Sequence, residues 1–248
     1  MRKLFLSEWH DIRFATFAET SATRLADAEF YNRYYCALFD RYSGYEQLDS
    51  HWRKTKEEVA EWVASNLPDG GRVLSIGCGL GYMEQYLWRN FETRLDLHVQ
   101  DFANEAHRWL RKVVPVERIH SPEDTADLGR YDLIYLSAVD YAMPDKELIG
   151  LLEKLRPYLR DGGEVAIFSA SFLDNSRWRR LVHSSKDVIK LLLETLGLYA
   201  RGQFWGWMRS RSEYQAVMAG AGYRSFGDGF IETSHQRTYW IKGRATGD

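Results

Sequence analysis

The sequence predicts an α/β fold whose core is a mostly parallel, doubly wound β-sheet. From residue 72 onward, short apolar runs rich in β-branched residues alternate with stretches of helical periodicity, and glycine or aspartate turns separate them. The last two runs, Tyr223 to Phe226 and Thr238 to Lys242, follow each other as strand, loop and strand. Five βα units and this terminal hairpin imply a last strand that runs antiparallel to the others.

The composition is that of a globular protein and excludes several other classes. Of the 248 residues 45% are hydrophobic and 27% charged, and the net charge of −2 gives no sign of a protein that coats nucleic acid or an anionic membrane. Cys36 and Cys78 form no C-x-x-C pair, which excludes a disulfide framework and zinc-ligand spacing. No run approaches the roughly 18 apolar residues of a membrane helix. We expect a soluble, cytoplasmic protein of one compact domain, without a metal site.

Residues 1–68 are expected to form an N-terminal helical cap. An aromatic-rich helix is predicted over Leu25 to Asp40, and Thr55-Lys56-Glu57-Glu58 has the pattern of a capping box that opens a second helix. The turn signal Pro68-Asp69-Gly70-Gly71 then separates this region from residues 69–248, where strands and helices alternate.

The elements of residues 69–248 are predicted in chain order. Expected strands are Arg72 to Ile76, Leu95 to Gln100, Val116 to His120, Tyr131 to Leu136 and Glu164 to Phe168. Expected helices between them are Tyr82 to Arg89, Asn104 to Val113 and Asp145 to Leu155. A lid-like insertion between strands 5 and 6 is expected over about 172–209, with a helix over Ser184 to Leu198. A capping box of Ser210 and Glu213 then opens a helix that ends at Ala221.

The strongest local signal is the glycine turn after the first strand. Gly77, Gly79 and Gly81 lie between a strand and a helix, where residues without a Cβ let the backbone approach a ligand closely. Their spacing is neither the dinucleotide fingerprint nor a P-loop, so phosphate binding is not favoured. A plain glycine-rich turn without a ligand is the alternative interpretation.

An acidic residue after the second strand favours the ligand-binding interpretation. Asp101 lies 24 residues beyond Gly77, at the carboxyl end of the strand, where a carboxylate can accept hydrogen bonds from both ribose hydroxyls. An adenosine-containing ligand that needs no phosphate contacts fits both features.

These motifs resemble those of the class I S-adenosylmethionine-dependent methyltransferases, over roughly Gly70 to Gly243. The matching segments are Ile76-Gly77-Cys78-Gly79-x-Gly81, Asp101, Tyr131-Asp132-Leu133-Ile134 and Leu159-Arg160-Asp161-Gly162-Gly163. The resemblance implies a Rossmann-like, seven-stranded sheet with S-adenosylmethionine over the carboxyl ends of the first strands. It also implies that a methyl group passes from the sulfonium to a nucleophile, which leaves S-adenosylhomocysteine.

The expected cofactor-binding residues follow from this resemblance. They are Gly77, Cys78, Gly79, Gly81, Glu84, Asp101, Phe102, Asp124 and Ser137. The chain departs from the family at Ser75, where an Asp or Glu is usual, and Glu84 in the next helix is the candidate to replace that acid. Near the adenine, Glu123 and Asp124 are alternatives, and we favour Asp124 over a solvated loop acid.

Methyl transfer asks for little acid–base chemistry, because the sulfonium is already activated and a base is needed only to remove a proton from a hydroxyl. The candidate catalytic residues are His235, Asp140 and Tyr141. Asp140 and Tyr141 follow the fourth strand directly, and Tyr141 is expected near the sulfonium, where a cation–π contact can form. The alternative for His235 is a surface-loop histidine.

The acceptor is expected to be small and anionic. From residue 173 to 211 there are eight Lys or Arg against three acids, so a lid built from this segment would attract a negative charge. The alternative is a solvated basic helix face. Candidate substrate-binding residues are Arg177 and Arg209 in this segment, and Tyr35 and His51 in the N-terminal cap.

The leading functional hypothesis is therefore a methyltransferase of a sugar, glycan precursor or secondary metabolite, with O-methylation favoured. An RNA or DNA methyltransferase is the second hypothesis, against which the net charge and the absence of a [DNS]-P-P-[YFW] pattern after the fourth strand count. A non-catalytic scaffold is the third. The sequence leaves the oligomeric state open, a homodimer included.

Overall fold

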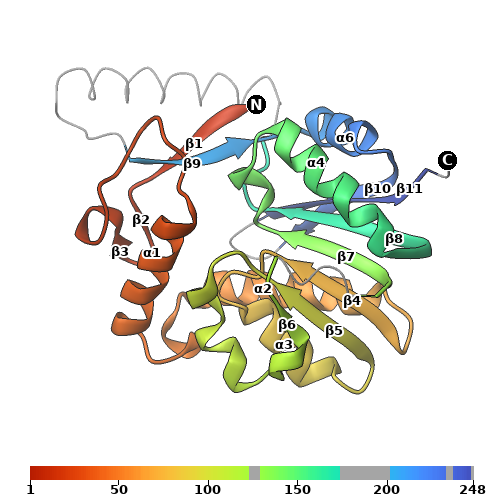
Figure 1. The fold of residues 1–248 in the computed structure, drawn as a ribbon, viewed down its shortest axis with the longest axis horizontal. Helices are drawn as coiled ribbons and strands as arrows, with labels where there is room; N and C mark the ends of the chain where they lie inside the picture. The colour runs from red at the N-terminus through yellow and green to blue at the C-terminus, as the bar shows by residue number, and fades with distance from the viewer. Residues whose placement is uncertain (123–128, 174–201, 233–236, 247–248) are drawn as a thin grey trace.

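The computed structural model describes residues 1–122, 129–173, 202–232 and 237–246 (Figure 1). Its central sheet consists of β4 (Gly71–Ile76), β5 (Leu95–Gln100), β6 (Ile119–His120), β7 (Tyr131–Ser137), β8 (Leu159–Ser169), β10 (Tyr223–Glu232) and β11 (Arg237–Ala245). The strand order is β10-β11-β8-β7-β4-β5-β6. Strands β4 to β8 pair in parallel, and β11 is antiparallel to both β8 and β10. The predicted seven-stranded α/β sheet with an antiparallel last strand is confirmed.

Helices cover both faces of this sheet (Figure 1). They are α2 (Ser50–Ser65), α3 (Tyr82–Phe91), α4 (Asp145–Leu155) and α6 (Arg211–Gly220). The apolar residues of α2 and α3 pack with one face, around Val73, Leu97 and Tyr135. Those of α4 and α6 pack with the other, around Leu74 and Ile134. Because successive side chains of a strand point to opposite faces, each inner strand contributes to both cores.

A cap lies beside the sheet and is built from two distant parts of the chain (Figure 1). Strand β1 (Arg2–Leu6) pairs antiparallel with β9 (Gln203–Met208). The short hairpin of β2 (Glu8–Trp9) and β3 (Ile12–Arg13) follows, and then α1 (Ala28–Arg41). Buried aromatic side chains such as Phe14, Tyr34 and Trp205 form its core. The cap therefore joins the chain's start to the segment that precedes α6.

The N-terminal region, expected to be helical, contains α1 and α2 but also three short strands within residues 2–13. Strand β1 pairs with β9, some two hundred residues away in sequence, and β2 pairs with β3. The predicted capping box at Thr55 is wrong. Helix α2 starts at Ser50, where the Asp49 side chain accepts a hydrogen bond from the Trp52 amide at 2.6 Å. Thr55 lies inside the helix and donates to the His51 carbonyl.

Several predicted bounds also need correction. Residues 104–112 form the 3-10 turns η3 (Asn104–Arg108) and η4 (Leu110–Lys112) instead of an α-helix, since β-branched residues 113 and 114 and the following Pro115 oppose one. The third strand is only β6. Strand β8 starts earlier than expected, at Leu159, and β10 continues to Glu232 past a register shift at Ser225 and Gly227. The expected helix Ser184 to Leu198 lies outside the described residues.

Other predictions agree closely with the structure. The bounds of β5 and α4 are those expected. Helix α6 begins with the predicted capping box, in which Glu213 accepts a hydrogen bond from the Ser210 amide at 2.8 Å. The carboxyl ends of β4, β5, β7 and β8 and the start of β11 lie at one edge of the sheet, under the cap.

Candidate active site

The glycine turn after β4 places its backbone next to the carboxylate of Asp101, at one edge of the sheet. Gly77 and Gly79 have φ angles of 69° and 57°, in the left-handed region that favours glycine. A Cβ on Gly77 would lie 2.3 Å from the Val139 side chain, so no larger residue fits there without a shift. The Gly79 amide donates a 2.7 Å hydrogen bond to Asp101, which follows β5. The turn and the predicted ribose-binding acid therefore form one unit.

Asp101 is buried but retains capacity to accept hydrogen bonds. One carboxylate oxygen accepts from the Gly79 amide and the other from the Ala103 amide at 2.8 Å. Each oxygen of an ionised carboxylate has a second lone pair. Burial raises the pKa of Asp101 to about 6, against which the backbone hydrogen bonds act. Because Asp101 lines the central cavity, it can present this charge to a ligand.

The acid that the family usually has at the position of Ser75 is replaced by Glu84, which is close to Ser75 in space and comes from a different element. Ser75 on β4 donates a 2.6 Å hydrogen bond to Glu84, the third residue of α3, and Tyr135 on β7 donates to the same carboxylate at 2.8 Å. Burial raises the pKa of Glu84. Glu84 does not itself line the cavity, so the structure places it behind Ser75 instead of in direct reach of a ligand.

Lys56 is a cavity residue that the sequence analysis did not single out. Its ammonium donates a 3.0 Å hydrogen bond to Ser137 at the end of β7. Within the described part of the chain, no carboxylate forms an ion pair with it, and burial lowers the pKa of Lys56. The sequence did contain a signal for this residue, namely the helical spacing of Trp52, Lys56 and Val59. These residues share one stripe of α2, and all three line the cavity.

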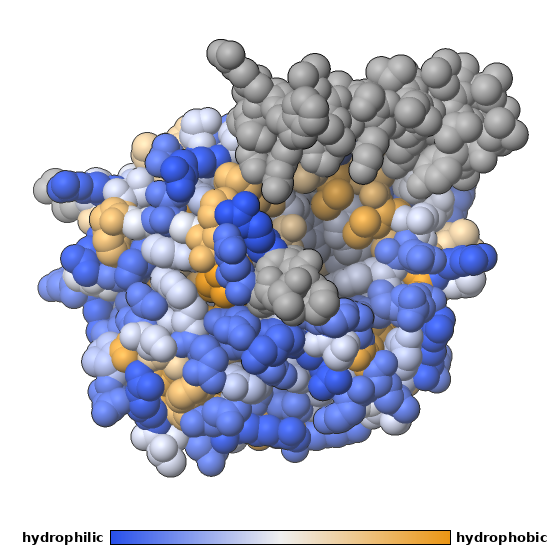
Figure 2. Space-filling model, turned by 180° about the vertical axis from the view of Figure 1, so that it is seen from behind, coloured by the Kyte–Doolittle hydropathy of each residue, from blue (hydrophilic) through white to orange (hydrophobic). Residues whose placement is uncertain are grey.

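The cavity has a volume of about 420 Å³ and extends from the glycine turn to the cap. Its lining includes Leu4, Leu6, Trp9, Tyr31, Tyr35, Trp52, Lys56, Gly77, Cys78, Gly79, Asp101, Phe102, Ser137, Tyr141, Ser171, Trp205, Met208 and Thr238. Figure 2 shows apolar residues gathered around a hollow in an otherwise mostly polar face. Among the described lining residues, Lys56 is the only Lys or Arg and Asp101 the only acid. The volume is that of a small-molecule site.

Aromatic rings form the wall of the cavity on the cap side. The Tyr141 ring lies 6.2 Å from Trp205 at an interplanar angle of 23°, and Tyr31 lies 5.2 Å from the same indole. Tyr35 is buried with its hydroxyl near Gly79, and Phe102, which follows Asp101, is 46% exposed. Burial raises the pKa of Tyr141 to about 12, so its hydroxyl is neutral.

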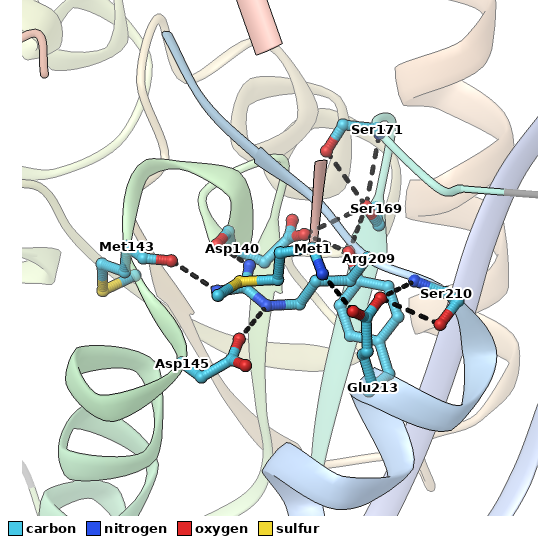
Figure 3. Close-up of polar contacts among 10 residues, drawn as sticks. Met1, Asp140, Met143, Asp145, Ser169, Ser171, Arg209, Ser210 and Glu213 are labelled. Carbon is cyan, nitrogen blue, oxygen red and sulfur yellow. Dashed lines mark hydrogen bonds and ion pairs between the residues drawn. The ribbon is translucent and has the colours of Figure 1, made fainter. Parts of the chain in front are cut away.

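The predicted residues Asp140 and Arg209 do not line the cavity but hold its edge together (Figure 3). The Asp140 carboxylate is fully buried and accepts hydrogen bonds from Ser169 at 3.0 Å and from Tyr214. The Arg209 guanidinium is fully buried as well. It donates to the Asp145 carboxylate at 2.7 Å and to the main-chain carbonyls of Asp140 and Met143.

Both assignments therefore need correction. Arg209, expected to bind the substrate, ties β9 to the loop after β7. Asp140, expected to be catalytic, fixes the turn from which Tyr141 reaches the cavity. The sequence placed both residues near the site, but a position at a strand end does not specify the direction of the side chain.

The remaining predicted residues have different outcomes. His51 is exposed and is not a lining residue. Gly81 caps the N-terminus of α3 with a φ of 73° and does not line the cavity. His235, Asp124 and Arg177 lie outside the described residues. Tyr35, Cys78, Phe102, Ser137 and Tyr141 line the cavity as expected, and their roles stay predictions.

In the part of the chain that the structure describes, no group of three or more His, Cys, Asp or Glu side chains is placed to hold a metal ion. None of the helices in the same ranges is both long and apolar enough to cross a membrane.

Comparison with known proteins shows the family. A family model described as a methyltransferase domain matches residues 46–224, which is most of the chain. The chain therefore belongs to the methyltransferase domain family, and the resemblance to class I S-adenosylmethionine-dependent methyltransferases is confirmed. The match includes β4 to β8, the glycine turn, Asp101 and all of α2 from Ser50.

Solved structures share the fold at low sequence identity. Magnesium protoporphyrin IX methyltransferase from Synechocystis PCC 6803 with bound SAH has a TM-score of 0.58 and 16% identity, over 88% of this chain and 97% of its own. The mitomycin 7-O-methyltransferase MmcR has a TM-score of 0.56 and 16% identity, over 88% and 57%. Human N-acetylserotonin methyltransferase in complex with SAM has a TM-score of 0.51 and 17% identity, over 89% and 57%. This chain thus spans little more than half the length of the last two.

Proposed function

We propose that the protein is an S-adenosylmethionine-dependent methyltransferase that acts on a small molecule, with O-methylation favoured. The observation that carries this proposal is the unit of Gly79 and Asp101, joined by a 2.7 Å hydrogen bond and open to a cavity of about 420 Å³. Family membership supplies the reaction class. Of the three solved structures described above, one has a name that specifies O-methylation and two contain SAM or SAH, which supports the same assignment here.

The residues present fit this cofactor. Asp101 would accept hydrogen bonds from the ribose hydroxyls, and Gly77 and Gly79 leave room for the ligand to approach the backbone. Lys56 is a half-buried cation without a described carboxylate partner, and it lies beside the end of β7. A carboxylate at the methionine end of the cofactor would supply that partner.

The bound cofactor would supply an activated methyl group on a sulfonium. The protein's own residues then have to orient the acceptor, exclude water and, for a hydroxyl acceptor, provide a route for its proton. The cap strands β1 and β9 and the ring of Tyr141 enclose the cavity on the side away from the sheet, which serves the first two tasks. His235 stays our proposed base; it lies outside the described residues.

The described lining does not favour an anionic acceptor. That hypothesis was based on the basic residues between 173 and 211, but Arg209 is committed to Asp145, and Arg211 forms an ion pair with Asp228 at 2.6 Å. The remaining basic residues of the segment lie outside the described ranges. An anionic acceptor stays a prediction, and so does the nucleic-acid alternative, which a cavity of this size does not favour.

The proposed cofactor can be tested against other adenosine ligands. Thermal unfolding is measured with SAM, SAH, ATP and NAD, each in excess. We expect SAM and SAH to raise the melting temperature and ATP and NAD to leave it unchanged, because the site offers no phosphate-binding loop. A shift with ATP or NAD alone would contradict the proposal.

A further inference from the structure

The cavity contains a buried hydroxyl that has no hydrogen-bond partner among the described residues. Thr238, at the start of β11, is 4% exposed, and its side-chain oxygen makes no hydrogen bond to any described residue. Leaving such a group unpaired costs stability, and valine would fill the same volume without that cost. Because Thr238 lines the cavity, a ligand can supply the missing hydrogen bond.

A second hydroxyl lies at the same edge of the cavity. Ser171 follows β8, is 7% exposed and lines the cavity. Its oxygen lies 3.5 Å from that of Ser169, which donates to the buried Asp140 carboxylate (Figure 3). Among the described residues, the Ser171 hydroxyl makes only this one contact, which leaves most of its hydrogen-bonding capacity for a ligand. Strand β11 pairs with β8 from Tyr239 and Ser169 onward, so Ser171 and Thr238 both lie just beyond the paired region.

These hydroxyls are far from the expected cofactor position. Asp101 follows β5, and Thr238 is the second residue of β11; between these two strands the sheet order contains β4, β7 and β8. Four strand spacings of about 4.8 Å separate the two ends of the cavity by roughly 19 Å. The ribose and methionine parts of the cofactor would occupy the β5, β4 and β7 end, which leaves the β8 and β11 end for the acceptor.

The wall of the cavity on the cap side is apolar. The ring of Tyr141 lies nearly parallel to that of Trp205, and Trp9 meets the same indole edge-on at 5.9 Å. Leu4 and Met208 from the cap strands complete this wall. Flat rings stack on such surfaces, whereas sugars and phosphorylated metabolites need more hydrogen-bond donors and cations than this wall offers.

We infer that the acceptor is a flat aromatic or conjugated-ring molecule, stacked on the wall of Tyr141 and Trp205 and anchored through a polar substituent by the hydroxyls of Ser171 and Thr238. This inference rests on the proposed methyltransferase function and specifies its acceptor. In this proposal Thr238 and Ser171 bind the acceptor, and they determine which edge of its ring system faces away from the cap.

The test is equilibrium dialysis of the full chain, with and without saturating SAH, against four probes. These are 2-naphthol, naphthalene, cyclohexanol and glucose 6-phosphate. We expect 2-naphthol to bind more tightly than naphthalene, and cyclohexanol and glucose 6-phosphate not to bind. Binding of glucose 6-phosphate, or failure of 2-naphthol to bind, would overturn the inference. SAH binding is measured on the same samples, so a failure of the methyltransferase proposal is recognised separately.

Variants then test the anchor. Thr238→Val is expected to weaken 2-naphthol binding about three- to tenfold, to leave naphthalene and SAH binding unchanged, and to keep or raise the melting temperature. The matched control is Thr246→Val, because Thr246 donates to the Gly222 carbonyl beyond the other end of β11, outside the cavity. Equal 2-naphthol affinity in the wild type and Thr238→Val, or an equal loss for naphthalene, would overturn the anchoring role. Ser171→Ala provides an independent second variant with the same expected pattern.

Discussion

The hydroxyl of Ser75 donates a 2.6 Å hydrogen bond to the carboxylate of Glu84, so the acid of this site comes from helix α3 instead of strand β4. One buried carboxylate, that of Glu84, is thus kept beside the glycine turn, but it lies behind Ser75 and does not line the cavity. Tyr135 donates to the same carboxylate, so three side chains share one hydrogen-bond network.

Restoring the usual acid at this position is therefore expected to destabilise the protein. In Ser75→Asp two carboxylates share a buried site, and we expect a loss of about 2–4 kcal/mol in the free energy of unfolding at pH 8, measured in urea. The difference in the free energy of unfolding between Ser75→Asp and the wild type becomes smaller as the pH falls, because protonation of one carboxyl removes the repulsion. The exchange variant, Ser75→Asp with Glu84→Ser, is expected to recover most of the loss. Additive losses in that double variant would argue against the network.

Cofactor affinity is expected to fall below a pH of about 6. The pKa of Asp101 is raised to about 6 by burial, and the ionised form is the one that accepts both ribose hydrogen bonds. Protonation on acidification therefore weakens binding, and affinity returns as the pH rises through this value. The dissociation constant of SAH between pH 5 and 8 checks this. A flat profile would remove Asp101 from the ribose site.

Lys56 is expected to recognise the amino-acid end of the cofactor. Lys56→Met should weaken SAH binding by about tenfold or more, since a charge-assisted hydrogen bond contributes about 1.5–3 kcal/mol. It should leave 5′-methylthioadenosine unaffected, because that ligand has no carboxylate. Loss of the wild-type preference for SAH over methylthioadenosine is the diagnostic result. Equal weakening of both ligands would point to a structural role instead.

The Arg209 network is expected to matter for stability and not for cofactor affinity. Arg209→Met leaves Asp145 and two main-chain carbonyls without their donor and is expected to cost about 3–5 kcal/mol in urea unfolding. Arg211→Met is the matched control. Its partner Asp228 forms a partly exposed ion pair, so a loss below about 1 kcal/mol is expected. If Arg209→Met were as stable as the control, the structural role assigned to Arg209 would be wrong.

The elements that the sequence predicted well are those with strong local signals. Strand β5 alternates apolar and polar residues, and α4 carries one leucine stripe, so each is specified by its own residues. Strand β1 has no such signal, because its pairing with β9 depends on residues some two hundred positions away. Likewise, the start of α2 was misplaced because Asp49 caps it, while the pattern at Thr55 imitates a cap inside the helix.

The candidate site likewise has residues that the sequence predicts and residues that it does not. Gly77, Gly79 and Asp101 were found because glycine spacing and an acid after a strand are visible in sequence. Thr238 was missed, since an unpartnered hydroxyl is recognisable only once its surroundings are known. Asp140 was placed near the site correctly but assigned the wrong direction, because burial behind Ser169 and Tyr214 depends on the packing of β8 and α6.

The central claim is that Asp101 and the glycine turn bind an adenosyl cofactor, and calorimetric titration with SAH tests it most directly. Three folded proteins are compared: the wild type, Asp101→Ala and Asp96→Ala, whose altered residue lies on the same strand but outside the cavity. We predict single-site binding to the wild type and to Asp96→Ala, and affinity at least about a hundredfold weaker for Asp101→Ala, which loses two charge-assisted hydrogen bonds. No binding to the wild type, or equal affinity in Asp101→Ala, would contradict the claim.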